Sequence, residues 1–304
     1  MTRSNKRGLA VPAILTAGSL WGTMGLFVRV YNARDLRSMD IVAIRAVSAV
    51  IAMFLFIMIQ KRDLFKIRLK DIWCFFGTGI GSIVFFNYCY FTTISLTSMS
   101  VAAVLLYTAP AIVIILSRLL FGEKFTVRKI TALVLTFIGC IFVTGIAGDA
   151  SALNIAGILT GLGSGLGYAL YSIFSRYAIE RGYHSLTISF YTFLIAAVVT
   201  MPFVNALGIV TVTVSSLWMV VFFLVFGVVS TVLPYTLYNY GLNTIENGKA
   251  SIIASVEPLV ATLLGIIIYH EKMSVGGITG MVLILGALVL CNSGAGSKKD
   301  GSCL

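Results

Sequence analysis

The sequence predicts an all-α integral membrane protein with ten transmembrane helices in two inverted five-helix repeats. Hydrophobic residues make up 59% of its 304 residues and charged residues only 11%, with a mean hydropathy of +1.00. Lipid rather than water must solvate such a composition. The pattern of residues 98–135 also recurs at 246–283, 148 positions later, so that Pro258 corresponds to Pro110. Repeated units that each interrupt a long apolar run are typical of membrane transporters.

Apolar runs of about 20 residues, each long enough to cross a hydrocarbon core of about 30 Å, define the expected helices. They lie at about 10–30, 40–60, 72–94, 99–120, 127–146, 154–178, 186–208, 217–241, 248–269 and 275–293. The two copies of the repeat, 10–146 and 154–293, hold five helices each. Because five is an odd number of membrane crossings, the second copy is inverted relative to the first. The Gly-, Ser- and Lys-rich tail 294–304 is predicted to be disordered in the cytoplasm.

The net charge of +11 is concentrated in short segments between the apolar runs. With the N-terminus in the cytoplasm, most of the 22 Lys and Arg residues fall on the cytoplasmic side, as the positive-inside rule expects. Both termini are therefore predicted to be cytoplasmic, in a multi-pass protein of the plasma membrane (the inner membrane of a bacterium). Because the sequence has no basic, aromatic-laced soluble face, no nucleic-acid partner is expected.

Motifs that would indicate catalysis or a bound cofactor do not occur in the sequence. The five cysteines show no CxxC spacing and no neighbouring histidine, which favours packing over metal or redox roles. No nucleophile elbow, HExxH or Walker loop is present. An enzyme, a metal site and a cofactor are therefore not expected.

Glycines recur at four-residue spacing in the first and sixth expected spans, as Gly18 and Gly22 and as Gly157, Gly161 and Gly165. Such spacing lets helix backbones approach closely in lipid. Close packing is the simpler interpretation, and flexing during a transport cycle is the alternative.

Glu257 is the first candidate for chemistry, because it lies about ten residues into the ninth span, next to Pro258. An ionisable group near the bilayer midplane costs several kcal/mol unless it is paired, hydrated or protonated. Substrate binding and proton coupling are the functional interpretations, and a carboxyl group bonded to a neighbouring helix is the structural one. Pro258 and Pro110 each remove a backbone donor and are expected to break their helices. The acid occurs in one repeat only, since Ala109 precedes Pro110.

Arg45 lies about five residues into the second span. Its long side chain could extend to the outer headgroups. Alternatively it faces the protein interior and holds a substrate carboxylate in a bidentate contact.

Polar and aromatic side chains also align at helical spacing in several spans. They are Trp21 in the first, Asn87 and Tyr90 in the third, Tyr107 in the fourth, Tyr168 and Tyr171 in the sixth, and Tyr235, Tyr238 and Asn239 in the eighth. Buried hydroxyl and amide groups need partners in lipid, so such stripes face a hydrated cavity or another helix. For any single tyrosine, a place in the interfacial aromatic belt is the alternative.

One motif occurs twice: an aromatic residue near the end of a span, an alanine-rich start to the next, a mid-helix proline and a Glu-Lys pair. Its copies are Tyr90, Ala102-Ala103, Pro110, Gly122-Glu123-Lys124 and Tyr238, Ala250, Glu257-Pro258, His270-Glu271-Lys272. Over about residues 10–293 this pattern resembles the EamA family of the drug/metabolite transporter superfamily. The sixth span departs from it, with Gly167-Tyr168-Ala169 where many members carry a tryptophan.

The resemblance implies a central cavity between the two inverted repeats, lined by spans one to four and six to nine, with spans five and ten outside it. It also implies export of a small metabolite, often an amino acid or a related compound. Such transport is usually driven by an ion gradient or by exchange rather than by ATP.

We therefore expect a secondary transporter, an exporter, that moves an amino acid or related zwitterion by alternating access, with proton coupling as an option. The substrate ammonium group would approach Glu257 or an aromatic face, and its carboxylate would seek Arg45. An exporter or exchanger of organic or quaternary cations, which needs no Arg45, stays open as an alternative. A non-transporting membrane scaffold is the other, although the polar stripes argue against it. The sequence is compatible with a monomer or a homodimer.

Overall fold

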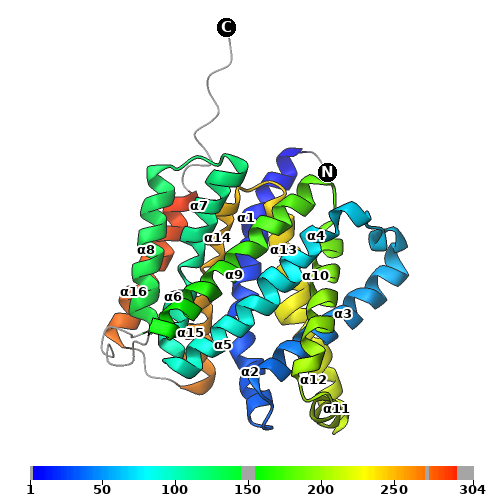
Figure 1. Cartoon of the computed structure of the whole chain (residues 1–304). Helices are drawn as coiled ribbons and strands as arrows, with labels where there is room; N and C mark the ends of the chain where they lie inside the picture. Colours follow the sequence, from blue (N-terminus) through cyan, green and yellow to red (C-terminus); the bar gives the residue numbers. More distant parts are fainter. Residues whose placement is uncertain (1–2, 145–154, 271–273, 293–304) are drawn as a thin grey trace.

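The computed structural model describes residues 3–144, 155–270 and 274–292, and within these ranges the regular structure is helical (Figure 1). In the first half of the chain the helices are α1 Arg3–Gly22, α2 Met24–Asn32, α3 Ser38–Gln60, α4 Ile72–Phe76, α5 Phe85–Leu96, α6 Met99–Leu106, α7 Ala109–Phe121 and α8 Val127–Thr144. In the second half they are α9 Ile155–Glu180, α10 Ser185–Thr200, α11 Ala206–Val214, α12 Leu217–Gly227, α13 Leu233–Leu242, α14 Asn247–Ala254, α15 Glu257–Tyr269 and α16 Val275–Asn292.

Helix boundaries recur between the halves at the offset seen in the sequence. In each of three helix pairs, equivalent ends are 148 positions apart. Helices α6 and α14 end at Leu106 and Ala254. Helices α7 and α15 begin at Ala109 and Glu257, and α8 and α16 begin at Val127 and Val275. Two π-helical segments, η3 Gly77–Val84 and η7 Val228–Val232, also have last residues that are 148 positions apart. The same backbone is thus built twice, including the wider turns that often accompany functional sites.

The fourth and ninth expected spans are each interrupted just before a proline. Pro110 is the second residue of α7 and Pro258 the second residue of α15. Proline fits the first turn of a helix, where its missing N–H is not needed, but it cannot continue a helix from the preceding turn. Each span therefore consists of two consecutive helices, α6 and α7 in the first half and α14 and α15 in the second.

Eight helical stretches of the described chain are long and apolar enough to cross a membrane. They are Leu9–Asn32, Ser38–Gln60, Leu69–Leu96, Val101–Phe121, Ile155–Glu180, Ser185–Phe203, Leu217–Leu242 and Asn247–Tyr269. A shorter apolar helix, Val275–Cys291, coincides with the tenth expected span, and α8 coincides with the fifth. A count of ten membrane-spanning helices stays a prediction.

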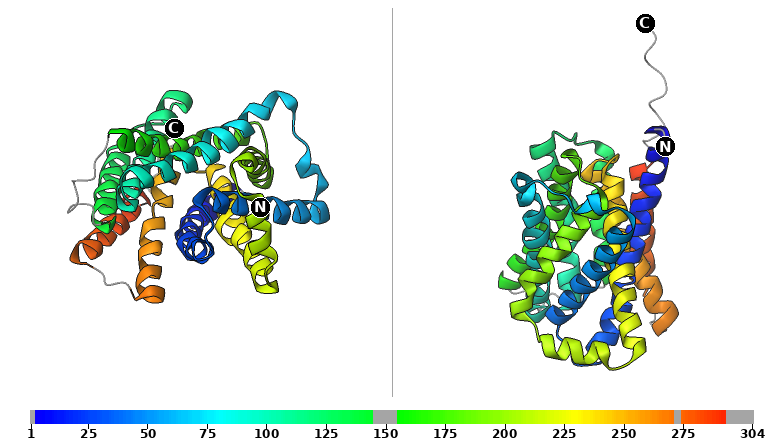
Figure 2. Two further views of the ribbon diagram at one scale, coloured as in Figure 1. Left: turned by 60° about the horizontal axis from the view of Figure 1, so that its bottom comes forward. Right: turned by 90° about the vertical axis from the view of Figure 1, so that its right-hand side faces the viewer.

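The seventh expected span, 186–208, ends earlier than the sequence predicts. Helix α10 stops at Thr200 and a short 3-10 turn, Met201–Phe203, follows, because Pro202 cannot extend the helix. Helix α11 then runs across the lower end of the bundle rather than along it (Figure 2). Asn205 starts α11 by accepting a hydrogen bond from the Gly208 N–H at 3.0 Å.

Neighbouring helices come largely from opposite halves of the chain. Helix α5 packs on α9, α1 on α13, α3 on α10, and α8 along α16 at one edge of the bundle. The largest cluster of buried residues lies among α1, α3, α9, α10, α13 and α14 and includes Ile14, Trp21, Met53, Tyr171, Phe193, Tyr235, Tyr238 and Ile253.

Two glycines hold the interrupted spans close to the opposite half. A Cβ atom on Gly18 of α1 would lie 2.6 Å from the carbonyl oxygen of Ala254, at the end of α14. A Cβ atom on Gly165 of α9 would lie 3.2 Å from the carbonyl oxygen of Leu105, near the end of α6. A larger residue at either position would push the helices apart, so these glycines permit backbone contact at both interruptions.

Candidate functional site

Two small cavities lie among the central helices, and Tyr168 lines both. The first is lined mainly by Trp21, Phe86, Tyr168, Tyr171, Tyr235 and Tyr238. The second is lined mainly by Tyr107, Pro110, Tyr168, Ser251, Ser255 and Glu257. Each has a volume of about 10 Å³, which is room for about one water molecule. An amino acid fits in neither, so binding one requires that the surrounding helices separate.

Aromatic rings enclose the first cavity. The Trp21 ring centroid lies 5.0 Å from that of Tyr235 and 5.5 Å from that of Tyr238. The Tyr171 centroid is 4.8 Å from that of Tyr235. Such contacts are favourable edge-to-face or tilted arrangements. The Trp21 indole N–H is buried and has no hydrogen-bond partner among the described residues, so this cluster retains an unsatisfied donor.

Glu257 begins α15 directly after the interruption and lines the second cavity. Its carboxyl group forms neither a hydrogen bond nor an ion pair with the part of the chain that the structure describes. The positive end of the α15 dipole favours a negative charge at this position. Arg45 is the basic residue that interacts with Glu257 electrostatically. An unpaired carboxyl group in this place can take up a proton or bind a cationic group.

Arg45 of α3 is buried, with 2% of the residue exposed. Its Nη1 donates to the Met24 sulfur at 3.1 Å, whereas Nε and Nη2 are buried without a partner among the described residues. The guanidinium group therefore lies inside the protein and does not reach out to the headgroups. Buried charged donors without acceptors are unfavourable, so this place suits water or an anionic group.

Three further predicted site residues, like Arg45, line neither central cavity. Asn87 donates to a backbone carbonyl of its own helix at 2.7 Å, and the Tyr90 ring packs against Phe86. The amide of Asn239 donates to the Tyr171 hydroxyl at 2.7 Å. These contacts support the shape of the aromatic cluster, and direct substrate contact by these three residues stays a prediction.

Glu123 joins α7 to α14 at the end of the bundle where α1 begins. Its two carboxylate oxygens accept hydrogen bonds from the backbone N–H groups of Asn247 at 2.7 Å and Gly248 at 3.2 Å. A side chain of the first half therefore caps the N-terminus of a helix in the second half, where a negative charge is favoured. We call this contact the Glu123 latch. The sequence predictions do not include this contact, although the repeated Glu-Lys pair is a signal for it.

Lys129 of α8 reinforces the latch. Its Nζ atom lies 3.5 Å from the Glu123 carboxylate and 2.5 Å from the Glu246 carboxylate. Helix α7 packs against α14. The equivalent helices of the repeat are α15 and α6, and they do not pack against each other as extensively within the described ranges. The counterpart of Glu123 is Glu271, which falls outside those ranges. At the end of the bundle where α1 begins, the latch therefore holds α7 and α14 together.

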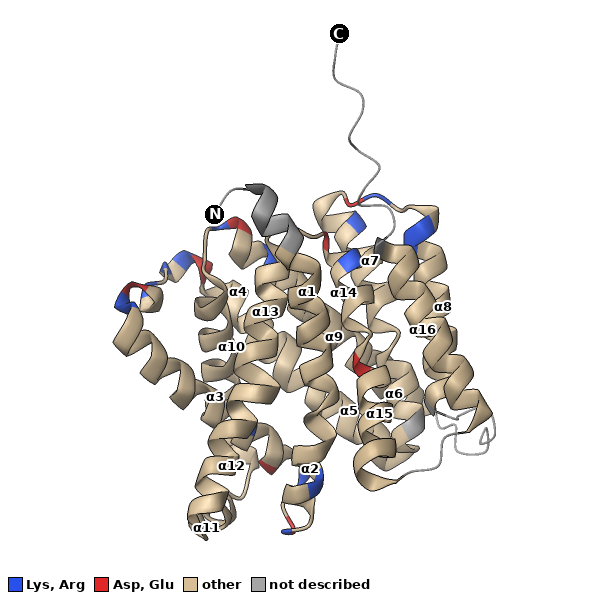
Figure 3. Cartoon of the chain, turned by 180° about the vertical axis from the view of Figure 1, so that it is seen from behind, with Lys and Arg blue, Asp and Glu red and all other residues tan. Residues whose placement is uncertain are grey.

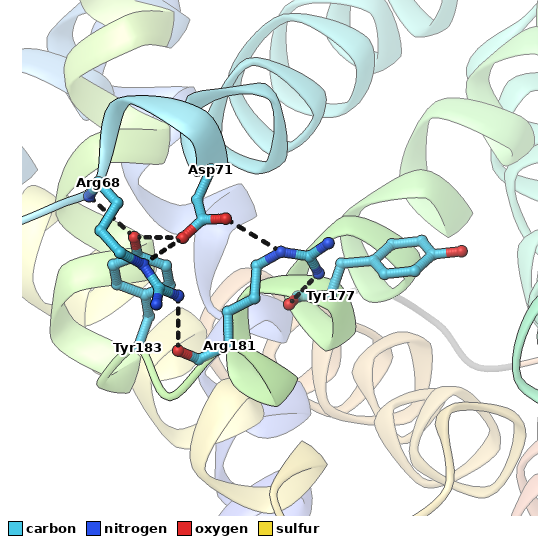
Figure 4. A network of polar contacts seen from close by, with 5 residues as sticks. All are labelled: Arg68, Asp71, Tyr177, Arg181 and Tyr183. Atoms are coloured by element: carbon cyan, nitrogen blue, oxygen red, sulfur yellow. Dashed lines mark hydrogen bonds and ion pairs between the residues drawn. The ribbon is translucent and has the colours of Figure 1, made fainter.

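A second polar network ties the halves together at the start of the third span (Figure 4). Asp71 accepts hydrogen bonds from Arg68 Nε at 2.7 Å and from the Tyr183 hydroxyl at 2.8 Å. Arg181 Nε donates to the other Asp71 oxygen at 3.2 Å, while its Nη1 donates to the Tyr177 carbonyl at 2.9 Å. The network fixes the end of α9 to the loop before α4.

The recurring helices, the paired interruptions and the polar centre all describe a duplicated membrane protein. Residues 8–145 and 155–293 each match the sequence profile of the EamA-like transporter family. This chain belongs to the EamA-like transporter family. The family resemblance predicted from the repeated motif is thereby confirmed. This EamA-like protein is a multi-pass membrane transporter of a small-molecule substrate and not an enzyme.

Relatives of this EamA-like transporter include an uncharacterized transporter of Archaeoglobus fulgidus, 32% identical over 202 residues, or 66% of this chain and 70% of the relative. The threonine/homoserine exporter RhtA of Escherichia coli is 26% identical over 225 residues, or 73% of this chain and 69% of RhtA. A crystal structure 16% identical in sequence covers 94% of this chain and 97% of its own, with a TM-score of 0.77. That likeness shows a shared fold.

Proposed function

We propose that this EamA-like transporter exports a small zwitterionic metabolite, such as an amino acid. The observation that carries the proposal is a pair of opposite charges, the guanidinium of Arg45 and the carboxyl of Glu257. Neither forms an ion pair within the described chain, and the two interact electrostatically beside one aromatic cluster. A zwitterion supplies a carboxylate for the first and an ammonium group for the second. The similarity to RhtA, a threonine/homoserine exporter, supports an amino acid substrate.

The proposed architecture is ten transmembrane helices in two inverted repeats, 10–146 and 154–293, around a central cavity. The recurring helix boundaries support the two repeats, and an odd number of spans in each would invert the second. Lys and Arg gather at the end of the bundle where α1 begins (Figure 3). By the positive-inside rule this supports a cytoplasmic location of that end and of both termini, in the plasma membrane.

Alternating access then acts through the interrupted spans. Loading from the cytoplasm requires that the Glu123 latch release α14, so that α7 and α14 separate. Because both central cavities share Tyr168, separation of these helices would merge them into one site that reaches from Trp21 to Glu257. A proton that replaces the substrate ammonium group at Glu257 would couple export to the proton gradient.

Uptake into proteoliposomes tests this function, with a labelled panel of amino acids and organic cations offered with and without a pH gradient. Saturable, gradient-dependent uptake of one zwitterion is expected. If folded protein moves none of the amino acids under either condition, the zwitterion proposal is wrong.

An organic or quaternary cation is the second candidate substrate. It is favoured by the ring cluster of Trp21, Tyr235 and Tyr238, because aromatic faces bind cationic groups. Such a substrate would use Glu257 and the rings but not Arg45. Transport of a quaternary ammonium compound that is unaffected by loss of Arg45 would select this candidate.

A further inference from the structure

A separate cavity of about 460 Å³ lies outside the central site, at the end of the bundle where α1 begins. Its walls come from the first turn of α8, the first turn of α14 and the end of α16. The lining residues are Thr126, Val127, Arg128, Lys129, Glu246, Lys249 and Cys291. We call it the α8–α14 pocket. It is much larger than either central cavity and shares no lining residue with them.

The charge of this pocket is positive and only partly compensated. Lys129 is already paired with Glu123 and Glu246. Arg128 and Lys249 form no ion pair with a carboxylate of the described chain. The first turn of α8 adds the positive end of a helix dipole to the same wall. Two uncompensated basic side chains and a helix N-terminus around a cavity suit a phosphate group.

The pocket also adjoins the apolar exterior of the bundle. Val127, which lines it, is 82% exposed, and Ile130 one turn along α8 is exposed as well. In a membrane these surfaces contact acyl chains. A ligand with a phosphate head and hydrocarbon tails therefore matches the pocket better than a soluble anion does.

We propose that the α8–α14 pocket binds the headgroup of an anionic phospholipid, with its phosphate between Arg128 of α8 and Lys249 of α14. The lipid links a helix that lines no central cavity to the helix that precedes Glu257. It also lies beside Lys129 and hence beside the Glu123 latch. The bound lipid therefore holds the N-terminus of α14 in place and stabilises the latch. This site is independent of which substrate the transporter carries.

The test uses the full chain purified in a neutral detergent, so that no charged membrane surface contributes. Short-chain phosphatidylglycerol, short-chain phosphatidylcholine and inorganic phosphate are titrated separately, with binding and thermal unfolding as readouts. The pocket variant is Arg128→Gln/Lys249→Gln. The control is Lys61→Gln/Arg62→Gln, which removes two exposed charges that line no part of the pocket.

Saturable binding of phosphatidylglycerol, with a raised unfolding temperature, is expected for the native chain and the control. The pocket variant should bind it at least about tenfold more weakly, or about 1.4 kcal/mol. Equal weakening in both variants would show only general charge attraction and overturn the proposal. Binding of inorganic phosphate without phosphatidylglycerol would identify a soluble anion instead of a lipid. Because no transport is measured, failure here says nothing against the proposed substrate.

Discussion

The interruption between α6 and α7 and the one between α14 and α15 occupy equivalent positions in the two halves, yet they differ in chemistry. Ala109 begins α7, whereas Glu257 begins α15. Both are followed by proline and both are approached closely by a glycine of the opposite half. Duplication has therefore repeated the backbone, while a single side chain makes one interruption a candidate ion or substrate site and leaves the other without a charge.

A second contrast involves Arg45 and its counterpart. Helices α3 and α10 begin at Ser38 and Ser185, so Arg45 corresponds to Thr192. The Thr192 hydroxyl lies 2.6 Å from the Thr78 hydroxyl and donates to a backbone carbonyl at 2.7 Å. Arg45 has two donors without partners. The polar group at the second-half position is thus satisfied within the protein, whereas two donors of Arg45 are not.

The largest effect is expected from Glu257→Gln, which makes the two interruptions alike in charge. Accumulation driven by a pH gradient should be lost, because an amide cannot exchange a proton for a substrate ammonium group. Exchange of internal for external substrate should continue. Glu180→Gln, a change at an exposed carboxylate of α9, is the control. Undiminished pH-driven accumulation by the Glu257 variant would remove this residue from coupling.

Arg45→Thr places at this position of the first half the residue type of its second-half counterpart, Thr192. Loss of a charged hydrogen-bond donor to a carboxylate should weaken amino acid binding by roughly 10- to 100-fold. Equilibrium binding of the transported amino acid measures this, and Arg45→Lys should recover part of the affinity. Arg34→Ala, at an exposed position, is the control. Unchanged affinity in the Arg45 variants would favour a cationic substrate.

Glu123→Gln tests how firmly the latch holds α7 and α14 together. A neutral amide caps α14 more weakly than a carboxylate, so the amides of Asn247 and Gly248 should exchange hydrogen roughly tenfold faster. Hydrogen exchange followed by mass spectrometry measures this, again with Glu180→Gln as the control. Exchange at the native rate would mean that the latch does not hold these helices together.

The smallest effects concern two equivalent helix ends. Gly122 after α7 and His270 after α15 both adopt left-handed backbone angles, with φ of +67° and +54°. Gly122→Ala should destabilise the protein by about 1 kcal/mol, whereas His270→Gly should be neutral or stabilising. Thermal unfolding in detergent gives both signs. Destabilisation of similar size by both changes would show that His270 makes a contact that outweighs its backbone strain.

Several features of the structure have no counterpart in the sequence predictions. The first span breaks at Thr23, whose hydroxyl donates to the Leu20 carbonyl at 2.7 Å, and no proline marks the break. A pattern based on hydrophobicity also does not predict the π-helical turns of η3 and η7. The capping role of Glu123 is not predicted either, because the helix that it caps is 124 residues further along the chain.

The sequence by itself determined the helices, the duplication and the family of this protein. In lipid a helix must satisfy its own backbone hydrogen bonds, so a long apolar run is enough to specify it. The tertiary structure decided which face of each helix turns inward, and so placed Arg45 inside and joined Glu123 to α14. Hydrophobicity cannot decide this, because lipid and the protein interior are equally apolar. Only close packing and hydrogen bonds between helices distinguish the two.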